Sequence, residues 1–379
     1  MTILTATRLS HAPIAGLAAV GIFWGGFAAY IPEFKERIGA TDGALGLALM
    51  GSAVGGIIAM YLAPRISAML GRAMLPVGAL VLALAFTYPL MAGSVPAFAL
   101  ALAGMGASVS VLDIGANMRV SDLEERHGLH LMNLSHAMFS FAFAGSALTA
   151  SLARRAGWPP EWLFPILALA LVLLILPMIE RDGWHVAPPA PDGAGHDGVW
   201  GAILPVAAIL FLAFVCENAT DSWSALHIER TLGGPAGDGG FGPAMLGLTM
   251  GIGRLSGQFA AQRLGEAGLI FWSAVVGVLG AVAIAAAPTP LMAILGVGLM
   301  GLGVAVTVPS ANSILGRLVR ADQRGFAISR AWMIGFTGFF IGPTLMGQVA
   351  EWAGLRVAFF GVAVLMAVML PLARAIGRR

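Results

Sequence analysis

Ionisable side chains are rare in this sequence, and a few of them interrupt long apolar runs where they could handle protons. Asp113 and Asn117 lie four residues apart in one run, and Asn133, His136 and Ser140 follow a helical stripe in the next. Burial favours the protonated form of a carboxyl group, and histidine titrates near neutral pH. We therefore expect Asp113 and His136 to approach one another as a proton-loading pair. The alternative is a structural hydrogen bond that ties two helices together.

A second group of charges lies in the C-terminal half of the chain. Glu217 and Asp221 are one helical turn apart in one apolar run, and Arg254 occupies the middle of the next. Equal depth on antiparallel helices predicts an ion pair between Glu217 and Arg254, which could be structural or functional. Breaking a buried pair typically costs about 3–5 kcal/mol in either case. Asp221 is then the less compensated carboxylate, and Asp221 and Glu217 are further candidates for proton coupling.

Two charged residues near the ends of apolar runs are candidates for a gate. Arg330 could hold an anionic ligand, close a gate, or extend to the nearest polar surface, as arginines near helix ends usually do. Glu33 lies beside Lys35 and Arg37, so we expect it in a solvated or gating salt bridge rather than in ligand binding.

Neutral polar side chains and one tryptophan complete the candidate binding residues. With Arg330, this set comprises Trp24, Asn117, Asn133, Asn218 and Asn312. The tryptophan could stack on a sugar or another ring, whereas asparagines in apolar helices can equally serve to join helices. No H-E-x-x-H, C-x-x-C or G-x-S-x-G pattern occurs. We therefore expect no catalytic residue, no metal and no cofactor.

The composition indicates that a membrane surrounds the elements that hold these residues. Of 379 residues, 58% are hydrophobic and only 11% are charged, whereas soluble domains carry about 25% charged residues. The apolar excess must face lipid. The single cysteine, Cys216, cannot form an internal disulfide, and a net charge of +2 does not suggest nucleic-acid binding.

Apolar runs of roughly 20 residues predict twelve transmembrane helices in two sets of six. The first set lies near residues 12–33, 44–63, 73–92, 95–118, 130–152 and 161–179, and the second near 202–227, 244–262, 268–287, 290–313, 325–348 and 354–373. The predicted organisation is a six-helix bundle at 1–179, a polar Pro/Gly-rich cytoplasmic linker at 180–200 and a second bundle at 201–379. The halves repeat, since Phe139 and Phe143 match Phe336 and Phe340 at one constant offset. Such repeats are typical of transporters that bind their substrate between the halves, near the bilayer midplane.

The distribution of basic residues predicts the orientation. With the N-terminus in the cytoplasm, the inside segments hold 13 of the 21 lysines and arginines and the outside segments hold 6. Cytoplasmic loops normally carry this excess, so both termini are expected inside. Lys35 is the only lysine, and the dominance of arginine indicates a bacterial source. A multi-pass protein of the bacterial inner membrane follows.

Six plus six spans with a long central loop resemble the major facilitator superfamily over the whole chain. The superfamily's motif after the second span is matched by L-A-P-R at 62–65 and G-R at 71–72, without its aspartate. A closer resemblance is to the fucose-permease-like branch of bacterial members. It is carried by the acid-x-x-x-Asn at 113–117, the N-L-x-x-x-x-x-S-F at 133–141, the W-S at 223–224 and the W-G at 24–25. An acid that the branch has in the middle of its first span is absent here, so fucose itself is not implied.

The resemblance implies an all-α integral membrane protein of twelve transmembrane helices, built as two pseudo-symmetric six-helix bundles. It further implies a secondary active transporter that works by alternating access as a monomer. Our leading interpretation is proton-coupled symport of a small polar solute, sugar-like or a related metabolite. The alternative is a proton-coupled antiporter that exports a drug or metabolite. A membrane sensor or scaffold is disfavoured, because the short loops leave little surface for a signalling partner.

Overall fold

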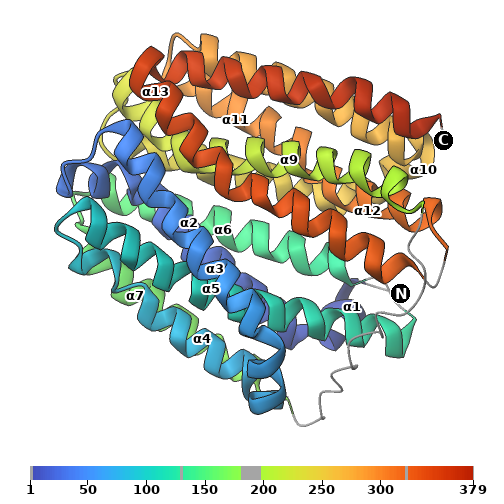
Figure 1. The fold of residues 1–379 in the computed structure, drawn as a ribbon. Coiled ribbons are helices and arrows are strands. Elements are labelled where there is room, and N and C mark those ends of the chain that lie inside the picture. The colour runs from blue at the N-terminus through green and yellow to red at the C-terminus, as the bar shows by residue number, and fades with distance from the viewer. Residues whose placement is uncertain (1–2, 129–130, 181–197, 321–322, 379) are drawn as a thin grey trace.

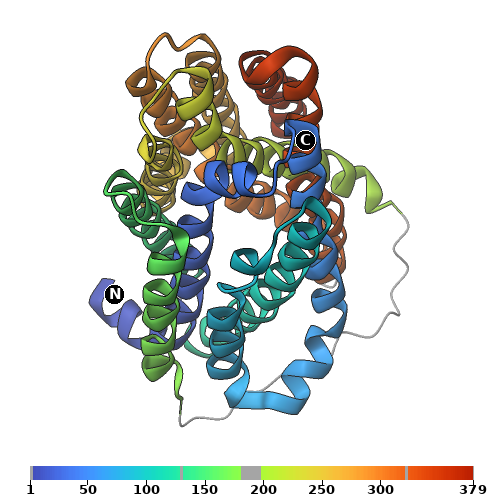
Figure 2. The same ribbon diagram turned by 90° about the vertical axis from the view of Figure 1, so that its left-hand side faces the viewer.

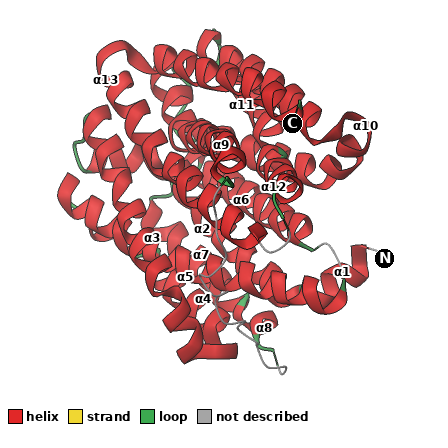
Figure 3. Cartoon of the chain, turned by 45° about the vertical axis from the view of Figure 1, so that its right-hand side comes forward, coloured by secondary structure: helices red, strands yellow, loops and turns green. Residues whose placement is uncertain are grey.

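The computed structural model describes residues 3–128, 131–180, 198–320 and 323–378, which are helical almost throughout and contain no strand (Figure 3). Residues 181–197 of the linker predicted at 180–200 lie outside this described part. The helices of the first half are α1 (Ile3–Leu9), α2 (His11–Arg37), α3 (Asp42–Leu70), α4 (Met74–Ala85), α5 (Val95–His127), α6 (Met132–Arg155), α7 (Pro160–Leu173) and α8 (Ile175–Met178). Those of the second half are α9 (Trp200–Leu226), α10 (Phe241–Ala286), α11 (Pro290–Ala305), α12 (Thr307–Leu318) and α13 (Arg324–Gly377). Single turns of helix lie at Gly71–Ala73, Pro89–Met91, His227–Thr231 and Asp238–Gly240.

Two of the longest helices each contain a break at which the chain reverses. Gly265 in α10 has φ 68° and Gly354 in α13 has φ 83°. Glycine takes this left-handed backbone region without the steric cost that a Cβ atom brings. Each break therefore replaces a loop between two membrane spans, and Figure 1 shows α13 turning back on itself.

The described helices provide the twelve predicted membrane crossings. Ten helical stretches are each long and apolar enough to cross a membrane, and the breaks divide α10 and α13 into two crossings each. The pairs α7–α8 and α11–α12 form one crossing each. Large apolar side chains on the outside, such as Tyr61 and Trp352, are 73% and 90% exposed, which suits a lipid environment.

The helix starts follow local capping chemistry. Thr41 precedes α3 and its hydroxyl oxygen accepts a hydrogen bond from the backbone nitrogen of Ala44 at 3.2 Å. Ser94 caps α5 in the same way. Such caps satisfy backbone N–H groups that have no partner within the helix, so they fix where α3 and α5 begin and therefore the depth of the residues that follow.

The helices form two groups that meet along a central interface. In Figures 1 and 2 the blue-to-green helices of residues 3–180 lie on one side and the yellow-to-red helices of residues 198–378 on the other. Both described chain ends lie at the same end of the bundle (Figure 1), which we call the terminal end. The opposite end, where residues 38–41, 156–159 and 232–240 connect helices, is the distal end.

Small residues bring the helices of each half close together. Gly55 on α3 lies against the backbone carbonyl of Ala103 on α5, where a Cβ atom would have no room. Close backbone approach of this kind is a main source of helix association in membranes, because lipid is as apolar as the side chains. The contact fixes α3 against α5, the helix that carries Asp113.

Candidate functional site

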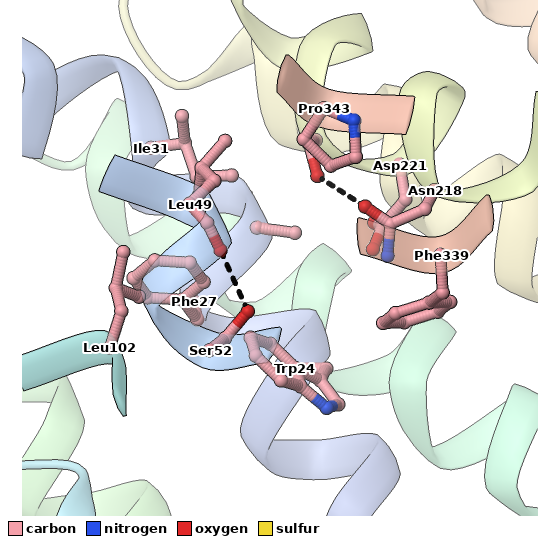
Figure 4. Close-up of a pocket in the computed structure, with 12 residues that line it drawn as sticks. Trp24, Phe27, Ile31, Leu49, Ser52, Leu102, Asn218, Asp221, Phe339 and Pro343 are labelled. Atoms are coloured by element: carbon pink, nitrogen blue, oxygen red, sulfur yellow. Dashed lines mark hydrogen bonds between the residues drawn. The ribbon is translucent and has the colours of Figure 1, made fainter. Parts of the chain in front are cut away.

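A small cavity, which we call the central cavity, lies between the two halves. Its volume is about 30 Å³, enough for one or two water molecules. Figure 4 shows Trp24, Phe27 and Ser52 on one side, with Asn218, Asp221 and Phe339 opposite them. The remaining lining residues are Ala28, Ile31, Leu49, Leu102, Ser222 and Pro343. Both halves therefore supply side chains to one small cavity.

Asp221 reaches this cavity from α9 with one carboxylate oxygen unpaired. Its Oδ1 atom is buried and accepts no hydrogen bond from the described residues. One turn earlier, Asn218 Oδ1 accepts a hydrogen bond from Ser222 Oγ at 3.1 Å, and no described residue bonds to the Asn218 amide nitrogen. Buried polar groups normally have partners, so the cavity offers an acceptor and a donor that a ligand can satisfy.

A chain of three polar side chains joins α5 to α6 nearer the terminal end. The amide nitrogen of Asn117 donates to the Oδ2 atom of Asp113 at 3.2 Å and to the Asp113 backbone oxygen at 2.9 Å. The Oδ1 atom of Asn117 lies 3.0 Å from His136 Nε2. Because an amide oxygen can only accept, His136 donates from Nε2 in this arrangement. Asp113 and His136 are thus linked through Asn117 rather than in direct contact.

Arg254 connects the two halves at the middle of the interface. From α10 it donates to the hydroxyl of Ser140 at 2.6 Å and to the backbone oxygen of His136 at 3.2 Å, both on α6. Its Nη2 atom lies 3.8 Å from Oε1 of Glu217 on α9. The structure thus places Glu217 and Arg254 together, at the long end of ion-pair distances, and adds a link to the helix of His136.

A buried ion pair joins the halves at the distal end. Arg154 on α6 donates to both carboxylate oxygens of Glu229, at 2.5 and 3.1 Å. Their side chains are only 6% and 11% exposed. Arg154 also lies over the ring of Tyr30 and 3.7 Å from Glu33, which is itself 3.7 Å from Arg37. Glu33 therefore lies in the predicted salt-bridge environment, with Arg154 as a partner from another helix.

Further polar contacts close the distal end beside this pair. Asp42, at the start of α3, accepts from Arg230 of the second half at 2.5 Å and pairs with Lys35 at 3.2 Å. The backbone nitrogen of Gly43 donates to Glu351 on α13 at 3.0 Å. Thr344, also on α13, donates to the backbone oxygen of Gly46 at 3.0 Å. The cavity is thus sealed on its distal side by hydrogen bonds between the halves.

Sequence comparison identifies the family to which this arrangement belongs. The family model of the Major Facilitator Superfamily matches residues 14–299 and 206–378, which together cover nearly the whole chain. The chain belongs to this superfamily. It is therefore a secondary transporter and a multi-pass membrane protein, as predicted.

Curated relatives of this superfamily member match it over most of their length. An uncharacterized MFS-type transporter of Yersinia pestis is 27% identical over 98% of this chain and 95% of its own. The membrane protein MosC of Rhizobium meliloti is 24% identical over 91% of this chain and 84% of its own.

Solved superfamily structures share the fold at low sequence identity. The nucleoside transporter NupG has a TM-score of 0.70 at 14% identity and covers 99% of both chains. A D-xylose-proton symporter has a TM-score of 0.71 at 13% identity and covers 99% of this chain and 97% of its own. At these identities the likeness shows the fold alone: two six-helix bundles.

The structure divides the predicted binding residues into two groups. Trp24 and Asn218 line the cavity, while Asn117 is engaged with Asp113 and His136. Asn312 accepts a hydrogen bond from Trp332 at 3.0 Å and so joins α12 to α13. Arg330 lies over the ring of Phe326 on its own helix, 5.0 Å from the ring centre. Arg330 and Asn133 both lie nearer the terminal end and are not among the residues that line the cavity.

Several residues at these sites of the transporter have no distinguishing feature in the sequence. Phe27, Ser52 and Phe339 are ordinary members of apolar helices until the cavity shows which face they present. Arg154 and Glu229 lie near span ends, where charges are usually solvated. A matched count of acids and bases among the distal segments could have suggested pairing there, but not which residues pair.

Proposed function

We propose that this chain moves a small polar solute across the bacterial inner membrane by alternating access, in symport with protons. The solute is sugar-like or a related metabolite, and both termini lie in the cytoplasm. The arginine bias supports this orientation, because the terminal end carries the excess of basic residues. The carrier works as a monomer, since the cavity is formed within one chain.

The observation that carries the proposal is the cavity between the halves, with its distal side sealed by contacts across them. A binding space that both halves supply is accessible from one side or the other as the halves rock. Here the pairs Arg154–Glu229 and Asp42–Arg230 hold the distal side shut. While these pairs hold, separation of the halves at the terminal end would open the cavity toward the cytoplasmic side.

Proton coupling is assigned to the carboxylates within the spans. Ionisable groups there are costly and are usually functional. Asp113 is linked through Asn117 to His136, and His136 shares its helix turn with the Ser140 hydroxyl bound by Arg254. Hydrogen bonds thus connect Asp113 to the ring of His136, and Arg254, which joins the halves, bonds to the backbone oxygen of the same histidine. Glu217 and Asp221 are the further coupling candidates.

The test is solute uptake by purified protein in proteoliposomes under an imposed pH gradient. A thermal-shift screen of sugars, polyols, nucleosides, organic acids, amino acids and lipophilic cations first selects the probe. A ligand at about 100 times its dissociation constant should add about 2.7 kcal/mol of stability. Symport predicts that the selected probe accumulates when the outside is acidic and that protons enter with it. Accumulation without proton movement would refute coupling.

Export by antiport is the second candidate. The observation that favours it is the unpaired Asp221 carboxylate in the cavity, which would suit exchange of a proton for a cationic compound. The same proteoliposomes distinguish the two, because antiport drives solute and protons in opposite directions. Protection of whole cells from toxic compounds by the expressed protein would also favour export.

A further inference from the structure

We propose that the transported solute carries a protonated amine, which binds between the carboxylate of Asp221 and the aromatic side chains of the central cavity. The inference rests on the proposed transport function and names the chemical class of its solute. The class is a small, polar, hydroxylated amine.

The charge of the cavity is the first argument. Asp221 is the one charged side chain among the cavity's described lining residues, and its Oδ1 atom has no hydrogen-bond partner. Arg254 is bound by Ser140, His136 and Glu217, and Arg330 of α13 lies over the ring of Phe326, outside the cavity lining. A buried carboxylate is costly to ionise unless a counter-charge pairs with it. No described residue supplies one to Asp221, so a proton neutralises the carboxyl group in the empty cavity and a cationic ligand would replace that proton when it binds.

The aromatic side chains are the second argument. Trp24, Phe27 and Phe339 line the space that Asp221 enters (Figure 4). The Trp24 ring is held by edge contacts with Phe23 and Phe27, at centroid distances of 5.5 and 5.8 Å. Aromatic faces attract ammonium groups, tryptophan most strongly. A carboxylate opposite such rings favours a cation over a neutral or anionic solute.

The neutral polar groups indicate a hydroxylated ligand rather than a lipophilic one. The amide nitrogen of Asn218 has no hydrogen-bond partner among the described residues, and Ser52 donates to the backbone oxygen of Leu49 at 2.8 Å. The Asn218 amide is therefore a free donor, and the hydroxyl oxygen of Ser52 can still accept a hydrogen bond. A ligand with hydroxyl groups satisfies both. The present volume of about 30 Å³ means that the ligand enters when the halves separate.

The test uses the full chain in lipid nanodiscs and matched probes that differ in charge. D-glucosamine is compared with D-glucose and N-acetyl-D-glucosamine, and ethanolamine with ethylene glycol, by thermal shift and by titration. We expect the two amines to stabilise the protein and their neutral partners to have little effect. Asp221→Asn keeps the side-chain shape and should weaken amine binding by about 30-fold or more, as loss of one member of a buried charge pair does. Glu36→Gln, which removes an exposed carboxylate at the distal end, should leave binding unchanged.

Three results would overturn the inference. They are an equal response to the neutral partners, an undiminished amine response in folded Asp221→Asn protein, and no response to either amine. Transport is measured separately, by counterflow of labelled probes in proteoliposomes. Counterflow of D-glucose without any effect of D-glucosamine would overturn the amine and leave the transport proposal intact. Amine binding without counterflow of any probe would overturn transport and leave the binding site intact.

Discussion

Replacing Glu229 with glutamine should shift the carrier toward a conformation that is open at the distal end. The Glu229 carboxylate accepts two hydrogen bonds from Arg154 of the first half. It also accepts from the backbone nitrogens of Gly237 and Gly239 in its own half, at 3.0 and 3.1 Å. Only the Arg154 bonds depend on the distance between the halves. A glutamine removes the charge and places an amide nitrogen where at least one donor now points.

The size of the shift follows from the bonds that only the closed distal end makes. A hydrogen bond to a charged group contributes about 1.5–3 kcal/mol, and the pair here is largely buried. We take the loss in Glu229→Gln to equal one such bond. Because about 1.4 kcal/mol changes an equilibrium ratio tenfold, the ratio of distally open to distally closed protein should rise roughly 10- to 150-fold. The folded state should persist, because the glycine bonds and the packing of α9 are kept.

The shift can be measured as a distance between spin labels on the two halves. Glu36→Cys and Ala236→Cys place labels at exposed distal positions of the first and second halves. The native Cys216 is buried, which limits its labelling. Double electron–electron resonance should show one dominant short distance in the parent and a second, longer population in Glu229→Gln.

A matched control is the Arg37–Glu161 pair. It lies at the same end at 2.5 Å, but both residues belong to the first half. Glu161→Gln should therefore leave the distance distribution unchanged. The reasoning is refuted if folded Glu229→Gln protein keeps the parent distribution, or if Glu161→Gln shifts it as much.

Three further predictions concern coupling, the central ion pair and helix packing. Asp113→Asn can still accept the hydrogen bond from Asn117, so it should fold but lose proton-driven accumulation while retaining counterflow; intact accumulation in proteoliposomes would contradict the coupling role. Glu217→Gln and Arg254→Gln should each lower the free energy of unfolding by up to about 3–5 kcal/mol, and the double variant should lower it by less than the sum of the two. Additive losses in a double-mutant cycle would exclude strong pairing. Gly55→Ala should lower the free energy of unfolding by about 1–3 kcal/mol through overpacking. Its control is Gly145→Ala, where a Cβ atom meets nothing within 4 Å, so that variant should be neutral or slightly stabilising. Equal thermal stability of the two variants would exclude the close contact of α3 with α5.

The membrane spans could be predicted from sequence because span length and apolar composition are set by the bilayer itself. Each predicted span overlaps a helix, and the differences lie at helix ends, such as that of α5, which continues from the predicted residue 118 to His127. Helical spacing also places Asp113 and Asn117 on one face correctly, since these residues are one turn apart. The contact of Asn117 with His136 on α6 needed only matched depth on two helices that meet, whereas the direct approach of Asp113 to His136 that we expected is replaced by the bridge through Asn117.

Contacts between the halves could not be predicted in this way. Arg154 and Glu229 are 75 residues apart, and Asp42 and Arg230 are 188 apart. Periodicity fixes the face of a helix but not which helix of the other half it meets. For the same reason the cavity lining could not be separated from other apolar positions, and Asn312 could not be distinguished as a residue that joins two helices.

The glycine breaks in α10 and α13 bear on how the second half enters the membrane. At each break one glycine replaces a connecting loop, and charged residues flank it, Arg263 and Glu266 at the first and Glu351 and Arg356 at the second. A single residue leaves no slack between the two spans, so the end of the first span holds the start of the next at the membrane surface. We therefore expect residues 241–286 and 324–377 to insert as helical hairpins. These four spans then enter the membrane in two pairs, and Gly265 and Gly354 form the turns of the two hairpins.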